Sequence, residues 1–145
     1  MSDFTDVQWQ PIGQLPLFEE LIGGLLDEVQ AFHATLAEAQ AKPHLLDDAT
    51  LDRVEAQYQE RQHFLDIYDE QFRRWRAAGV TPSQERTLRG LAREVAATRP
   101  VVQQVLELVA ALRTGTIDRI RELSDEELGL MSLLGLTPEE MHKRR

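Results

Sequence analysis

The most constraining feature of this chain is a line of apolar residues between Thr81 and Gly115. Eight positions there alternate at spacings of three and four residues over four heptads, and seven of them are apolar. The positions are Leu88, Leu91, Val95, Thr98, Val102, Val105, Val109 and Leu112. This spacing is typical of a helix face that packs against other helices. We therefore expect a long helix here, ending at about Thr114.

Two earlier segments repeat the same spacing. One runs from Leu15 to about residue 41, where Lys42 and Pro43 end it, and the other runs from about Thr50 to Ala78. Their positions are Leu15, Phe18, Ile22, Leu25, Val29, Phe32, Leu36 and Ala39, then Leu51, Val54, Tyr58, Arg61, Leu65, Tyr68, Phe72 and Trp75. Gly23 and Gly24 interrupt the first segment, and we expect a slight bend or a close approach of another backbone there, with a functional hinge as the alternative.

The ends of the predicted helices suggest how they are connected. Gly79 is a stop signal, and Thr81-Pro82-Ser83-Gln84 is a capping box that starts the next helix almost at once. A link this short favours antiparallel neighbours. Pro100 should kink the third helix, and further cap signals predict short helices at 117–123, 124–134 and 137–145. The expected fold is all-α: an antiparallel up-down-up bundle of three long heptad-patterned helices plus short C-terminal helices.

Residues 1–14 contain Pro11 and Gly13 and show no helical period. We interpret them as an extended N-terminal arm, for which Phe4, Trp9 and Ile12 are possible anchors. Residues 15–145 are then a single helical-bundle domain, since 145 residues is a one-domain length.

The composition excludes several chemistries. The chain has no cysteine, which removes thiolate metal sites and cysteine nucleophiles. Its first residues lack the basic start of a signal peptide, and its longest apolar run, 128–136, is too short to span a membrane. We therefore expect a cytoplasmic protein that binds no membrane.

The net charge of −9 is unevenly distributed. Residues 1–70 carry 15 acidic and 3 basic residues, residues 71–121 carry 4 and 10, and residues 122–145 carry 6 and 3. Most of this acidic chain should be repelled by nucleic acid, so nucleic acid is an improbable partner. Only the arginine-rich residues 71–121 would attract nucleic acid.

One charged residue occupies a core position. Arg61 stands in the apolar line of the second helix, and the expected helix pairing places it level with Val29 and Val102. A charge there needs a partner or must extend to solvent along its own stem. We expect an ion pair with Glu28 that fixes the register, with anion or ligand binding as the alternative.

Basic residues gather at one end of the predicted bundle, around the link at Gly79. Basic residues interleaved with an aromatic ring can hold phosphate or single-stranded nucleic acid, but they also suit the negative end of a helix and acidic partners such as Glu19 and Glu20. Together with Arg61, these residues are the candidate partner-binding or anion-binding residues: Arg73, Arg74, Trp75, Arg76, Arg86, Arg89 and Arg93.

Motifs for catalysis are weak. Glu60-x-x-His63 has the spacing used in di-iron helical bundles, but no second copy follows, and the helix period turns both residues outward. Asp66 and Asp69 are one turn apart, and such carboxylates could hold Mg²⁺ only if more oxygens converged with them. We therefore predict no catalytic residues, metal site or cofactor, and favour a protein that is not an enzyme.

The leading functional hypothesis is a non-enzymatic helical-bundle protein-interaction module, acting as an adaptor, chaperone-like or accessory protein. Apolar residues outside the three lines widen the apolar faces beyond what three helices can bury: Leu17, Leu21, Leu26, Phe64, Ile67, Val101, Leu106 and Leu108. We expect residues 128–136 to cover part of these faces, and a second copy in a homodimer or another protein partner to cover the rest. The alternatives are a metal-dependent phosphohydrolase built on helix carboxylates, and anion or nucleic-acid binding at the arginine-rich end.

Overall fold

The structure is a computed structural model that describes residues 4–41 and 46–121, with side chains through residue 113. Every regular element in these residues is helical, so the all-α prediction is confirmed for this part of the chain. The elements are the short 3-10 turn η1 (Ile12–Gln14) and the helices α1 (Leu15–Ile22), α2 (Leu25–Gln40), α3 (Asp48–Ala78) and α4 (Pro82–Arg121).

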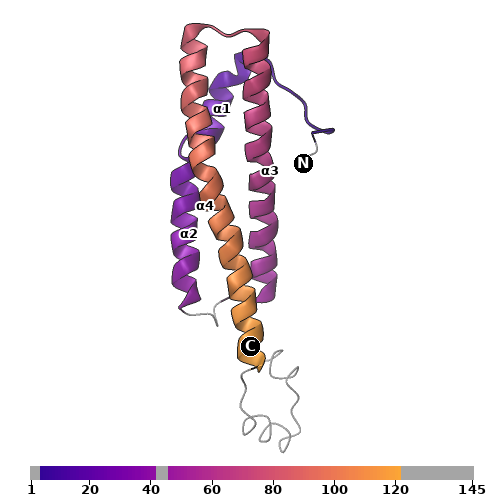
Figure 1. Ribbon diagram of the computed structural model, residues 1–145, viewed down its shortest axis with the longest axis vertical. Helices are drawn as coiled ribbons and strands as arrows, with labels where there is room; N and C mark the ends of the chain where they lie inside the picture. The colour runs from indigo at the N-terminus through magenta and orange to yellow at the C-terminus, as the bar shows by residue number, and fades with distance from the viewer. Residues whose placement is uncertain (1–3, 42–45, 122–145) are drawn as a thin grey trace, which may run out of the picture.

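The helices form an elongated assembly of three rods (Figure 1). In Figure 1, α1 and α2 follow one another along one rod, α3 forms the second, and α4 the third. The long helix α4 comes closest to both α3 and α2 along its backbone, whereas α2 and α3 meet through side chains such as Phe32 and Tyr58. The core accordingly follows α4, where Val95, Val102, Val105 and Val109 are at most 1% exposed.

The first predicted helix is in fact two helices. Gly24 has φ +78°, a left-handed conformation that disfavours other residues, and a Cβ at Gly23 would lie 2.7 Å from the Glu19 carbonyl oxygen. Both glycines are therefore needed for the break between α1 and α2. A slight bend is the wrong prediction here, and no other chain segment lies within 4 Å of a Cβ built on Gly24.

The predicted helix ends at the turn between α3 and α4 are confirmed. Gly79 ends α3 with φ +99°. In the capping box, the Gln84 amide donates to Thr81 Oγ1 at 3.1 Å, and the Thr81 amide donates to Gln84 Oε1 at 2.9 Å. At the other end of α3, Asp47 caps the helix by accepting a 2.7 Å hydrogen bond from the Thr50 amide. Hydrogen bonding to the Thr50 side chain, and then this bond from its backbone amide, lower the pKa of Asp47.

The helix α4 is longer than predicted. It continues through Pro100 and past Gly115 to Arg121. The expected end at Thr114 and a separate short helix at 117–123 are therefore wrong, because one glycine costs only about 1 kcal/mol inside a helix and no proline follows it there. The short helices predicted at 124–134 and 137–145, and the cover expected from residues 128–136, lie outside the described residues.

The N-terminal arm lies against α3. The side-chain amide of Gln71, which is 2% exposed, accepts from the Gln10 amide at 2.7 Å and donates to the Gln10 carbonyl oxygen at 3.2 Å. Trp75 Nε1 donates to the same carbonyl at 2.8 Å. Nearby, the ring of Trp9 lies under the guanidinium of Arg74 at 4.2 Å, and Phe4 stacks on His63. These contacts attach the arm to the upper part of α3 (Figure 1).

By length and apolar composition alone, the Pro82–Arg113 part of α4 also qualifies as a membrane-crossing helix. Core helices of soluble proteins have the same length and composition. In this fold, the apolar line of α4 is turned toward α2 and α3, as shown by the burial of Leu88, Val95 and Val105.

Candidate functional site

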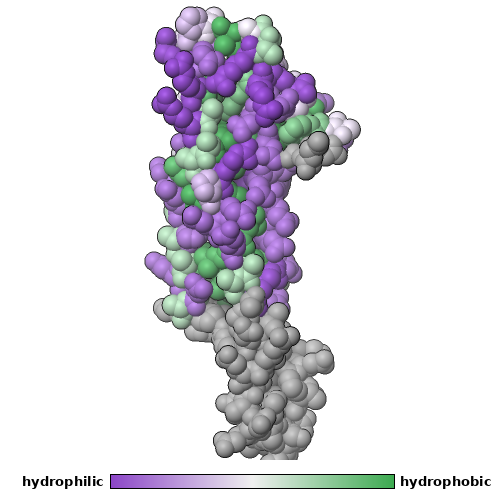
Figure 2. Space-filling view, viewed as in Figure 1, coloured by the Kyte–Doolittle hydropathy of each residue, from purple (hydrophilic) through white to green (hydrophobic). Residues whose placement is uncertain are grey.

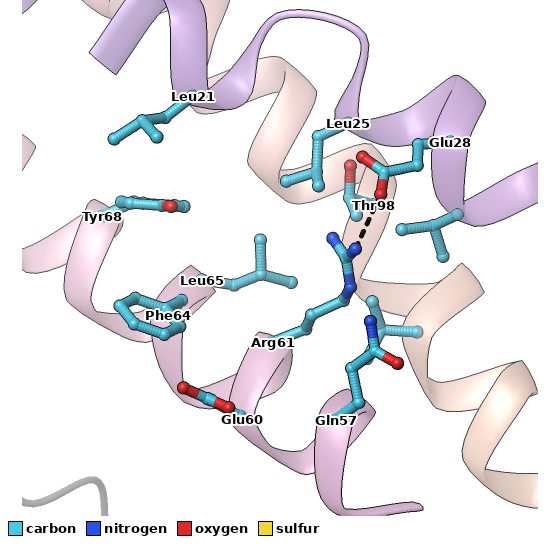
Figure 3. Close-up of a pocket in the computed structure, with 12 residues that line it drawn as sticks. Leu21, Leu25, Glu28, Gln57, Glu60, Arg61, Phe64, Leu65, Tyr68 and Thr98 are labelled. Carbon is cyan, nitrogen blue, oxygen red and sulfur yellow. Dashed lines mark hydrogen bonds and ion pairs between the residues drawn. The ribbon is translucent and has the colours of Figure 1, made fainter. Parts of the chain in front are cut away.

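A cleft of about 280 Å³ opens beside the break between α1 and α2. Leu21 comes from the last turn of α1, Leu25 from the first turn of α2, and Phe64 and Leu65 from the middle of α3 (Figure 3). Thr98 and Val102 of α4 also line it. The cleft therefore lies where the first rod is interrupted, between that rod, α3 and α4.

The lining of the cleft combines apolar side chains with the polar side chains of Glu28, Gln57, Glu60, Arg61 and Thr98, and two of the apolar side chains face solvent. Leu21 is 51% exposed and Phe64 is 42% exposed, whereas Leu65 is only 1% exposed. Leu17, one turn before Leu21 on α1, is also exposed, at 44%. Complete burial of an exposed side chain of this size by a partner contributes about 1.5–3 kcal/mol to the free energy of binding. The surface around the cleft can therefore supply binding free energy that the isolated chain leaves unused.

Arg61 is the central polar residue of the cleft. Its Nη2 donates to Glu28 Oε1 at 2.7 Å, which confirms the predicted ion pair. Its Nε is buried and has no hydrogen-bond partner within the described part of the chain. Figure 3 shows Arg61 extending from α3 toward Glu28 on α2, with Thr98 beside the guanidinium. A buried donor without an acceptor is costly, so this guanidinium is incompletely satisfied.

Two tyrosines lie on either side of Arg61 along α3. The Arg61 guanidinium is 5.4 Å from the centre of the Tyr58 ring, a cation–π distance, and Tyr68 lines the cleft. Burial raises the pKa of both phenols, and the charge of Arg61 opposes this rise in both. Both phenols are therefore neutral at physiological pH, where they can donate or accept hydrogen bonds.

The arginine-rich end is partly satisfied by neighbouring carboxylates. Arg73 and Arg74 lie 3.1 Å and 3.4 Å from Glu70, one turn earlier on α3, and Arg76 lies 3.1 Å from Glu85 on α4. The expected partners Glu19 and Glu20 take no part in these ion pairs. Trp75 is 4% exposed and donates to the arm, so it belongs to the core and not to a binding surface.

Three other predicted residues do form a free basic face. Arg86, Arg89 and Arg93 are exposed and share one side of α4 at spacings of three and four residues. No ion pair joins them to an acid within the described ranges 4–41 and 46–113. The strongly hydrophilic surface near the link between α3 and α4 is visible in Figure 2. Arg61, in the cleft, is separate from this group.

The carboxylates considered for metal binding have other partners. Asp66 and Asp69 accept from Arg99 of α4 at 2.6 Å and 2.5 Å. Burial opposes the charge of Arg99, but these two carboxylates outweigh it, so the pKa of Arg99 is raised. Glu60 lines the cleft, and His63 stacks on Phe4 of the arm. Among the described residues, no three acidic or imidazole side chains are grouped as a metal would require.

The sequence contained a partial signal for this site. It singled out Arg61 and counted Leu21 and Phe64 among eight extra apolar residues, but it did not bring them together. Tyr68 and Thr98 were predicted only as members of the apolar lines. Comparison of the chain with protein-family models, with curated proteins and with solved structures finds no match. The functional argument therefore depends on the geometry of the cleft.

Proposed function

We propose that this protein is a non-enzymatic protein-interaction module, an adaptor or accessory protein whose binding surface is the cleft between the broken first rod and α3. The observation that supports this most directly is the exposure of Leu21 and Phe64 at the mouth of a cleft that also holds an incompletely satisfied guanidinium. Exposed apolar groups around a concave site are typical of interaction surfaces.

In this proposal the long helices form the up-down-up, heptad-patterned bundle that the sequence predicts, and they serve as a rigid frame. The bundle carries the cleft at mid-length and the basic face of Arg86, Arg89 and Arg93 near one end. A partner protein covers the cleft, in a cytoplasmic setting. A homodimer is the version of this proposal in which the partner is a second copy.

Site-specific photo-crosslinking in cells that express the protein tests the proposal. Benzoylphenylalanine placed at Phe64 should give a discrete crosslinked species, because that side chain is exposed at the cleft. The same group at Ala56, which is exposed on α3 but does not line the cleft, is the matched control. A crosslink to a second copy selects the homodimer. Equal labelling at both positions, or none at Phe64, would contradict the proposal.

A second candidate function is anion or nucleic-acid binding at the basic face. One observation favours it: Arg86, Arg89 and Arg93 share an exposed side of α4 without carboxylate partners in the described residues. Binding of a fluorescent single-stranded oligonucleotide should then weaken steeply with salt, since each neutralised phosphate releases counterions. Replacing these three arginines with glutamine should abolish it, and replacing Arg73, which is paired with Glu70, should matter less.

A further inference from the structure

The chemistry of the cleft narrows the kind of partner segment that fits it. The walls accept a large apolar side chain, because Leu21 and Phe64 flank the opening and Leu25 and Leu65 lie deeper (Figure 3). A volume of about 280 Å³ accommodates a side chain or two, not a whole helix. The apolar requirement alone does not distinguish one peptide from another.

The Arg61 guanidinium adds a second requirement. Arg61 has five N–H donors, and the side-chain hydrogen bond that it makes among the described residues goes to Glu28 from Nη2. The Nε donor has no partner there, but it has less than 1 Å² of exposed surface, so a ligand in the cleft does not reach it in this conformation. A ligand oxygen can instead accept from the remaining Nη donors, because the Arg61 side chain is 23% exposed, and such a bond to a charged donor is stronger than one between neutral groups.

The charge of the side chains that line the cleft indicates which kind of ligand oxygen can accept a hydrogen bond from Arg61. Glu28 and Glu60 both line the cleft, against the single cation Arg61, so these groups sum to −1. A carboxylate ligand would have to compete with Glu28 for the guanidinium and would be repelled by Glu60. A neutral carbonyl oxygen avoids both costs. A basic side chain next to it would gain from the two rim carboxylates, of which Glu28 is 62% exposed.

We infer that the cleft binds a short peptide segment that combines a large apolar side chain, an unpaired backbone carbonyl and an adjacent Lys or Arg. The last turn of an amphipathic helix has this combination, because its final carbonyls lack helical partners and basic residues favour that position. This inference rests on the proposed interaction function and specifies the chemistry of the partner.

Selection of random 12-residue peptides displayed on phage against the full-length protein tests the inference. Selected peptides should carry Leu, Ile, Phe or Met next to Lys or Arg, and a synthetic copy should bind in fluorescence anisotropy. Leu21→Asp should weaken binding at least about tenfold, since it puts a charge into the apolar wall. Ala56→Asp, which adds the same charge at an exposed position of α3 outside the cleft lining, should leave binding unchanged.

Arg61→Met and Glu60→Lys probe the polar part of the site. The methionine variant keeps the aliphatic stem but removes the donor, so it should weaken binding roughly threefold to tenfold. The lysine variant should lose the preference for basic peptides. Circular dichroism melting confirms that each variant is folded.

Three results would overturn the inference: no peptide that distinguishes wild type from Leu21→Asp, a consensus rich in Asp or Glu, or binding unaffected by Arg61→Met. A discrete photo-crosslink at Phe64 together with any of these would leave the interaction function standing and refute only the peptide chemistry. If the photo-crosslink at Phe64 is absent and the peptide experiments also fail, both the interaction function and the peptide chemistry are refuted.

Discussion

The two sides of α3 are closed in different ways. Toward α4, Arg99 binds both Asp66 and Asp69, and Arg113 lies within ion-pair distance of two further carboxylates. Toward the first rod, Arg61 binds Glu28 alone and leaves Nε unpaired. An arginine thus links α3 to a neighbour on both sides. Among the described residues, the two guanidiniums that face two carboxylates each across a helix interface, those of Arg99 and Arg113, lie on the α4 side.

This difference follows from the helix break. The α4 side of α3 faces one continuous helix. The other side faces two shorter helices with Gly23 and Gly24 between them, neither of which has a side chain to fill the gap. The aromatic pair Phe32–Tyr58, with ring centres 4.9 Å apart, closes the part nearer the end of α2. A glycine pair therefore opens an interface locally while the rest of the interface stays packed.

The largest expected effect is a difference in the free energy of unfolding between variants at Leu65, which is buried at the bottom of the cleft, and at Leu21, which is exposed at its edge. Leu65→Ala should lower the free energy of unfolding by about 2–5 kcal/mol, because it removes buried methyl groups and leaves a cavity. Leu21→Ala should cost less than about 1 kcal/mol, because that side chain is half exposed. Urea denaturation of the two variants measures this. Equal losses would mean that the cleft is closed in solution.

The next effect concerns the break itself. Gly24→Ala should cost about 1–2 kcal/mol, because the left-handed φ of +78° is unfavourable for a residue with a Cβ. Gly13→Ala is the control, because Gly13 has no positive φ and, like Gly24, has no atom within 4 Å of the added methyl group. Thermal and urea unfolding compare the two variants. A stabilised Gly24→Ala protein would indicate that α1 and α2 form one continuous helix instead.

A smaller effect should distinguish the two arginines. Arg99→Met should destabilise the fold by about 1 kcal/mol after screening by solvent, because Asp66 and Asp69 are left as neighbouring like charges one turn apart. Arg61→Met should cost about 0.5 kcal/mol or less, because the exposed Glu28 can be hydrated and the buried Nε disappears. If Arg61→Met is the more destabilising change, then Arg61 is a structural residue and not a binding residue.

The smallest effect is confined to alkaline pH. Burial raises the pKa of Tyr58 and Tyr68 above the usual 10.0, so above pH 10 the unfolded chain has lost protons that the folded chain keeps. Stability is therefore fully present below pH 10 and decreases as the pH rises through the folded pKa values. Tyr68→Phe should flatten this decrease in urea titrations at pH 9 to 11. An unchanged slope would indicate that Tyr68 is hydrated.

Several features of the site could be predicted because they depend on local spacing. The apolar lines identified core residues such as Val95 and Val109, and the capping box at Thr81 identified the start of α4. The pairing of Arg61 with Glu28 followed from aligning the helices in the antiparallel register that their loops suggest. The break at Gly24 could not be predicted, because a glycine pair permits a left-handed turn, a bend or a continuous helix, and packing selects among them.

The sequence by itself determined the helical class, the buried lines and the concentration of arginine near one end, because periodicity, caps and composition act over a few residues. Only the tertiary structure decided which arginines are free. Arg76 has a carboxylate from the next helix, Arg86 has none among the described residues, and Arg61 lies in the cleft with one donor unpaired. Those outcomes depend on which side chains from distant segments come within a few ångströms, and helical spacing carries no information about that.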